Sequence, residues 1–188
     1  MPRAEPTDKP LLPQGAELAA PPTRAKVYLS LAVAFALTLL PWAERTHWLV
    51  PDFTLMLLLY WNVREPRLAG LGMAFILGLM TDVAWGVLMG LNALGYCAAT
   101  FVALLVQRRL AGFDLARQTL QLAPILFAKE VVVLVLGLMM GRGEVDWRWL
   151  AAGVIAGLLW LPMALLMAAI TGRPSSTRPA GPRPRSRT

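Results

Sequence analysis

Metal ligands and catalytic nucleophiles are scarce in this sequence. Its 188 residues include one cysteine, Cys97, and one histidine, His47. A single cysteine excludes an internal disulfide, and the pair is too small a set for a His/Cys metal cluster. Cys97 lies in an apolar run, where a packing role is expected rather than a reactive thiol. We therefore expect no metal and no other cofactor.

A catalytic set is also missing. Ser30 is the only serine before the C-terminal tail. The apolar runs and charge distribution described below place Ser30 and His47 on opposite sides of a membrane, which excludes a Ser–His relay. The sequence contains no Walker A, HExxH or paired CxxC motif. Carboxylates are present, but acid–base catalysis needs two groups converging on one substrate, which nothing in the sequence requires. We predict that the protein is not an enzyme.

Charge is sparse as well, since only 15% of the residues are charged and 57% are hydrophobic. A soluble domain of this length cannot bury so much apolar surface, so we expect an integral membrane protein. The net charge of +7 does not indicate a nucleic-acid partner, because five of the eighteen basic residues lie in a tail beside the last apolar run. Such a tail is attracted to the anionic lipids of the cytoplasmic leaflet.

Six apolar runs predict an all-α polytopic membrane bundle of six transmembrane helices. The second run is the least certain span, because its eleven residues reach only about 16 Å as a helix. Proline-rich flanks predict a disordered cytoplasmic arm at 1–25 and a disordered basic tail at 172–188, which leaves a membrane domain at 26–171. The predicted spans are residues 27–42, 53–63, 68–88, 91–106, 119–140 and 149–170.

The distribution of lysine and arginine predicts the orientation. Most of the eighteen basic residues fall on the side that holds both termini, whereas only Arg45, Arg142 and Arg148 fall on the other side. Because basic residues accumulate on the cytoplasmic side, both termini are expected there.

The most informative segment is residues 68–94, an apolar run that contains one carboxylate, Asp82. On a helix, Gly78, Asp82 and Gly86 share a face of small residues that allows a neighbouring backbone to approach closely. An ionised carboxylate near the middle of a bilayer costs roughly 2.5 to 3.5 kcal/mol, so Asp82 should face protein or a wet cavity. Gly86 and Gly90 then favour a tight reversal into the next run.

Lys129 and Glu130 lie in the middle of the fifth predicted span. Adjacent helical residues point about 100° apart, so each is expected to need its own partner. A structural contact between one of them and Asp82 is the simplest interpretation, and it would hold the third and fifth spans together. A transport or proton-relay role and contact with a partner subunit remain open.

Pro162 interrupts the sixth predicted span, two residues after Trp160. A proline inside a helix frees the carbonyl four residues earlier and typically produces a kink. Packing geometry is the simplest account of this pair.

Three segments carry patterns that together resemble one family of bacterial inner-membrane proteins. Residues 41–61, PWAERTHWLVPDFTLMLLLYW, contain a Pro-Trp pair after a span, then Pro51-Asp52, and close on Tyr60-Trp61. Residues 78–96, GLMTDVAWGVLMGLNALGY, contain in order Asp, Gly, Leu/Met-Gly and Ala-Leu. Residues 157–162, GLLWLP, are similar to a Gly-x-x-Trp-Pro element, with the proline one residue late. In these segments the chain resembles the rod shape-determining protein MreD family.

This resemblance implies a non-catalytic scaffold of the cell-elongation (Rod) complex in the bacterial inner membrane. It implies binding to the single-span protein MreC and a place beside MreB, RodA and penicillin-binding protein 2, where the scaffold helps to organise lateral peptidoglycan synthesis and cell shape. The implied fold is similar to the six-helix substrate-binding subunits of energy-coupling-factor vitamin transporters.

The main alternative is a membrane-embedded substrate-binding component of a small-molecule transporter. Ala32 and Ala36 form a small-xxx-small pair of the kind through which such subunits dock. Against this, a ligand site needs several converging polar groups. The predicted spans contain few of them: Asn62, Asp82, Asn92, Thr100 and Glu130 are nearly all.

Overall fold

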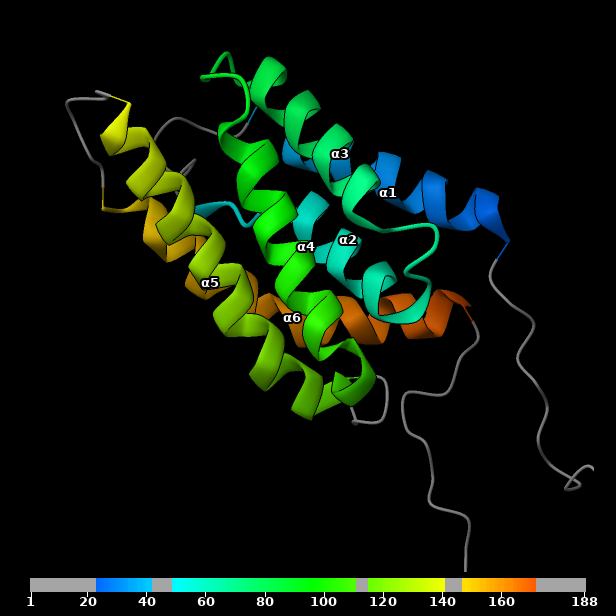
Figure 1. Cartoon of the computed structure of the whole chain (residues 1–188). Coiled ribbons are helices and arrows are strands. Elements are labelled where there is room, and N and C mark those ends of the chain that lie inside the picture. Colours follow the sequence, from blue (N-terminus) through cyan, green and yellow to red (C-terminus); the bar gives the residue numbers. More distant parts are fainter. Residues whose placement is uncertain (1–22, 42–48, 111–114, 141–146, 172–188) are drawn as a thin grey trace, which may run out of the picture.

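The computed structural model describes residues 23–41, 49–110, 115–140 and 147–171, and these contain six helices and no strand (Figure 1). The prediction of an all-α fold is therefore confirmed. The predicted disordered tail and nearly all of the predicted arm lie outside the described residues. The helices are α1 (Arg24–Thr38), α2 (Phe53–Arg64), α3 (Leu71–Ala84), α4 (Leu91–Leu110), α5 (Leu115–Met139) and α6 (Trp149–Thr171).

Two segments are long and apolar enough to cross a membrane, by length and composition: Ala116–Met139 and Trp149–Thr171. Two further apolar helices, Leu71–Ala84 and Leu91–Gln107, are shorter. The twelve residues of α2 extend about 18 Å, well below the hydrocarbon thickness of about 30 Å.

The short helix α2 forms the centre of the bundle. Every residue from Thr54 to Val63 is buried, and α2 packs against α1, α3, α4 and α6. Its sequence is apolar on all sides, which is typical of a helix enclosed by other helices. Figure 1 shows α2 behind α4, between α1 and α6.

The helices α3 and α4 form a close hairpin, as the run of small residues predicts. At Gly78 an added Cβ would lie 2.5 Å from the Cα of Ala93, so the two backbones are in direct contact. The turn uses Gly86 at φ 59° and Gly90 at φ 100°, which are left-handed conformations that glycine adopts without strain. The predicted tight reversal is confirmed.

Prolines lie inside two helices without ending them. The helix α6 continues through Pro162 to Thr171, and α5 continues through Pro124, a residue that the sequence analysis did not single out. Trp160 is fully buried within the core.

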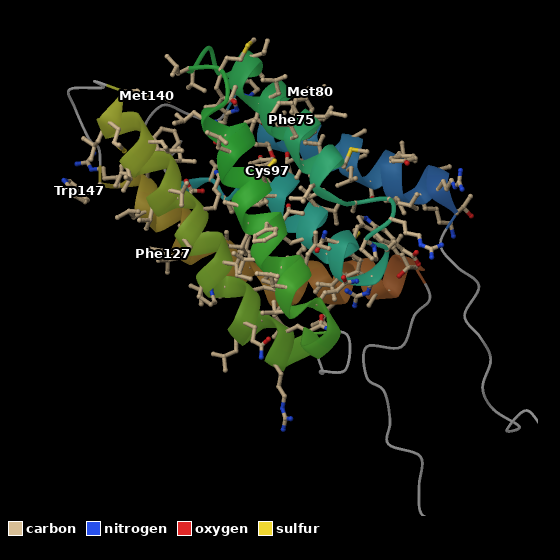
Figure 2. The ribbon with its side chains drawn as sticks, in the orientation of Figure 1. Phe75, Met80, Cys97, Phe127, Met140 and Trp147 are labelled. Carbon is tan, nitrogen blue, oxygen red and sulfur yellow. The ribbon has the colours of Figure 1, made fainter. Side chains whose placement is uncertain are left out.

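Large apolar side chains cover the outside of the bundle. Phe75 and Met80 on α3 are about half exposed, and Figure 2 shows both pointing away from the other helices. Soluble monomers rarely expose extensive contiguous apolar surface, whereas lipid chains solvate such side chains. The exterior is therefore that of a protein embedded in a membrane.

Candidate functional site: a cavity above a buried ion cluster

A cavity of about 390 Å³ lies at the end of the bundle where α1, α3 and α5 end and α2, α4 and α6 begin. Its walls are mostly apolar, and charged side chains lie together on one part of them. Each helix or helix boundary contributes to the lining, for example Thr38, Asp52, Trp85, Asn92, Lys129 and Trp149.

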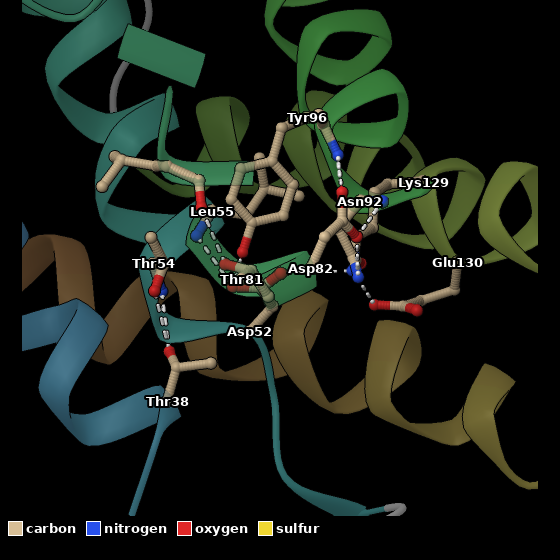
Figure 3. Close-up of polar contacts among 12 residues, drawn as sticks. Thr38, Asp52, Thr54, Leu55, Thr81, Asp82, Asn92, Tyr96, Lys129 and Glu130 are labelled. Carbon is tan, nitrogen blue, oxygen red and sulfur yellow. Dashed lines mark hydrogen bonds and ion pairs between the residues drawn. The ribbon is translucent and has the colours of Figure 1, made fainter. Parts of the chain in front are cut away.

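The charged part of the lining is organised around Lys129. Its Nζ lies 3.1 Å from Oδ2 of Asp52 and 3.0 Å from Oε1 of Glu130, and its side chain is only 6% exposed (Figure 3). Lys129 precedes the end of α5 by ten residues, which corresponds to about 15 Å along the helix. Charges at such a depth are costly unless they are paired, and this cluster pairs them.

Asp52 reaches this depth because it is the residue that caps α2. Its Oδ1 accepts hydrogen bonds from the backbone N–H of Leu55 at 3.0 Å and from the hydroxyl of Tyr96 at 2.6 Å. Aspartate is favoured at this position because the first N–H groups of a helix have no acceptor within the helix. The helix α2 therefore begins level with the middle of α5, which explains why its apolar run is short. Pro51 precedes it and also lines the cavity.

Asp82 is completely buried by protein, as its position in an apolar run predicts. Its carboxylate accepts hydrogen bonds from the backbone N–H groups of Gly90 at 2.9 Å, Asn92 at 2.8 Å and Ala93 at 3.2 Å, and from the Asn92 side-chain amide at 3.0 Å. It thus closes the turn and caps the start of α4, where the helix dipole favours a negative charge.

The predicted contact of Asp82 with Lys129 or Glu130 is wrong. The tight turn brings several unpaired N–H groups to Asp82, so the carboxylate is satisfied without a cation. It links α3 to α4 instead of linking the third and fifth spans.

The expectation that Lys129 and Glu130 need separate partners is also wrong. Their long side chains bend toward each other despite the divergence of their Cα–Cβ directions, and they form a direct ion pair. Asp52, the second partner of Lys129, was not predicted from the sequence as a partner of either residue. A Pro-Asp pair directly before an apolar run is a helix-start signal, and it could have indicated that Asp52 lies inside the bundle.

Tyr60 and Trp61 do not line the cavity. They lie near the C-terminal end of α2, where the indole N–H of Trp61 donates to Oγ of Ser30 at 2.9 Å and joins α2 to α1. The guanidinium of Arg64 lies 3.8 Å from the centre of the Tyr60 ring. Trp160 and Pro162 are also absent from the cavity lining.

One aromatic pair at the cavity was not predicted from the sequence. Trp85 follows α3 and Trp149 begins α6, and their ring centres are 6.1 Å apart in an edge-on arrangement. Both rings line the cavity. Within the described residues, no group of three or more His, Cys, Asp or Glu side chains could hold a metal ion.

Comparisons with known proteins identify the family. Residues 24–170 match the model of the family described as rod shape-determining protein MreD. The Rod shape-determining protein MreD of Haemophilus influenzae is 27% identical over 135 residues, which cover 72% of this chain and 83% of that protein. No solved structure matches the chain. The chain therefore belongs to the MreD family of rod shape-determining proteins.

Proposed function

We propose that this protein is a non-catalytic membrane scaffold of the bacterial cell-elongation machinery, and that its cavity receives a segment of MreC. Membership of a rod shape-determining family supports the role in cell shape. The cavity is the single observation that carries the docking proposal, because all six helices or their ends contribute to its lining. Through this contact the scaffold helps to organise lateral peptidoglycan synthesis.

The proposed topology is six spans in the inner membrane with both termini in the cytoplasm. The bias of lysine and arginine toward one side supports this orientation. The cavity then opens on the outer face, since it lies at the end of the bundle where α1, α3 and α5 end. The short α2 starts inside the membrane and is shielded from lipid by its neighbours.

The chemistry of the cavity suits a peptide segment. Its volume lies within the range of about 300 to 1,000 Å³ that is usual for ligand pockets, and its walls combine apolar side chains with a few polar groups. A single-span partner such as MreC leaves the membrane on the outer face, where its first residues outside the span can enter this recess. MreB, RodA and penicillin-binding protein 2 are proposed to belong to the same complex.

A second candidate is a small-molecule binding component of a transporter, and the same cavity favours it. This reading requires a bound small molecule that survives purification or competes with MreC. The likeness to substrate-binding subunits of energy-coupling-factor transporters stays a prediction.

Filling the cavity tests the docking proposal. Val87 and Leu134 line it from the α3–α4 turn and from α5, so Val87→Trp combined with Leu134→Trp introduces two indoles into the recess. The matched control places two indoles on the outside, at Leu120 and Leu158, which are 78% and 71% exposed. We expect the first variant to lose co-purification with MreC in mild detergent and the control to retain it. Equal recovery of MreC with both variants would contradict the proposal.

A further inference from the structure

The ion cluster in the cavity contains one more negative than positive group. Asp52 and Glu130 are carboxylates, and Lys129 is the only cationic side chain that contacts them among the described residues. Asp52 receives two further hydrogen bonds, from Leu55 and Tyr96, whereas Lys129 is the one described partner of Glu130. Glu130 is therefore the least compensated of the three charges.

Glu130 is positioned to contact whatever enters the cavity. Its side chain is 11% exposed and lines the recess, and Figure 3 shows one carboxylate oxygen turned toward Lys129 while the other is turned away. In a region of low dielectric constant, a carboxylate that shares its one cation with a second carboxylate still interacts strongly with any further cation that approaches it.

The two indoles of the cavity favour the same class of group. Trp85 and Trp149 present aromatic surface to the recess, and aromatic faces attract ammonium and guanidinium groups, with tryptophan the strongest. An acidic group and an aromatic pair in one cavity are thus two separate features that select a cation. Neither feature selects an anionic occupant.

We propose that the segment received by the cavity inserts a basic side chain, lysine or arginine, which pairs with Glu130 beside Trp85 and Trp149. This inference rests on the proposed function, because it specifies the chemistry of the partner segment. It makes Glu130 the residue that determines specificity, while the apolar walls supply the remaining contact area.

The test measures the affinity of the purified full-length protein for MreC. Glu130→Gln keeps the size of the side chain and leaves the Lys129–Asp52 pair intact, and we expect it to weaken binding at least about tenfold, because a desolvated charge loses its partner. Glu130→Asp retains the charge and should bind more tightly than Glu130→Gln. An unchanged affinity in Glu130→Gln would overturn the proposal.

A double-mutant cycle identifies the basic partner. Each lysine and arginine of the MreC segment next to its span is replaced by glutamine, and each replacement is measured against both the native protein and Glu130→Gln. We expect one replacement to weaken the binding of MreC to the native protein at least about tenfold. The same replacement should weaken its binding to Glu130→Gln less than about twofold. If no replacement is coupled in this way, the proposal is wrong. The glutamine replacements are made in MreC, so they leave the scaffold itself unaltered. Their effect on binding to the native protein remains informative even if Glu130→Gln unfolds easily.

Two further outcomes separate this inference from the docking proposal. If the indole-filled cavity blocks MreC but Glu130→Gln does not, docking stands and the basic side chain is rejected. If the indole-filled cavity binds MreC normally, the docking proposal itself fails. The remaining case is that this chain itself supplies the cation. Arg45 and Arg142 are therefore replaced by glutamine, one at a time, in the native protein and in Glu130→Gln. If either replacement is coupled to Glu130, the cation belongs to this chain and the inference is overturned.

Discussion

Asp82→Ala removes the carboxylate that holds the start of α4 against the end of α3. Three backbone N–H groups, those of Gly90, Asn92 and Ala93, lose their acceptor in a region with little water. At about 1 kcal/mol for each donor left unpaired, the free energy of unfolding should fall by about 3 kcal/mol. That is a large share of a total stability that is typically about 5 to 15 kcal/mol.

Thermal unfolding in mild detergent measures this loss. For a chain of this length, about 3 kcal/mol corresponds to a fall in Tm of about 6 to 12 °C. Cys97 is the only cysteine and is half-buried, so its reaction with a thiol dye reports unfolding from a single site. In Asp82→Asn the free energy of unfolding should fall less, by about 2 kcal/mol. Only the N–H groups of Gly90 and Ala93, which donate to Oδ2, would then face the new amide group.

The neighbouring residue provides the control. Thr81 is also buried, but its hydroxyl donates to the Leu77 carbonyl of its own helix. Thr81→Val should therefore cost about 1 kcal/mol or less. If Asp82→Ala melts at the same temperature as Thr81→Val, the capping role assigned to the carboxylate is wrong.

Three further substitutions test the packing and the ion cluster, each through the same melting measurement. Gly78→Ala would bring a Cβ to 2.5 Å from the Cα of Ala93, and an overpacking cost of about 1 to 3 kcal/mol should exceed the helix-propensity gain of at most about 1 kcal/mol. Tyr96→Phe removes the 2.6 Å hydrogen bond to Asp52 and should cost about 1.5 to 3 kcal/mol. Lys129→Met leaves buried carboxylates without their cation and should cost about 3 to 5 kcal/mol.

Two of these substitutions, Gly78→Ala and Lys129→Met, have an internal check. Gly72→Ala adds a Cβ with nothing within 4 Å, so it should be neutral or stabilising, and a loss equal to that of Gly78→Ala would refute the steric account. Adding Asp52→Asn and Glu130→Gln to Lys129→Met removes the uncompensated charges and should recover much of the lost stability. If it recovers none, charge burial is not the cause of the loss.

The fold was largely predictable because hydrophobic runs alone locate helices in a membrane protein. Each of the six predicted runs overlaps one helix, and the glycines of the α3–α4 turn indicated its position. The start of α2 was predictable to the residue at Phe53, because Pro51 and Asp52 are the usual signals for a helix start.

The pairing of charges was not predictable from spacing. From the sequence, either Asp82 or Asp52 is a possible partner for Lys129. Asp52 is the actual partner because of the depth at which α2 begins in the bundle. That depth depends on how α2 packs against four other helices, which is tertiary information. The Trp85–Trp149 contact was missed for the same reason. It joins the C-terminal end of α3 to the N-terminal end of α6, and these two helices are far apart in the sequence.

Site-specific photocrosslinking in cells tests the central claim most directly, because it asks whether MreC occupies the cavity. A photoreactive residue at Leu134 faces the recess, whereas one at Leu120, on the same helix α5, faces outward. We predict a crosslink to MreC from position 134 and none from position 120. A crosslink to MreC from position 120 with none from position 134 would contradict the account.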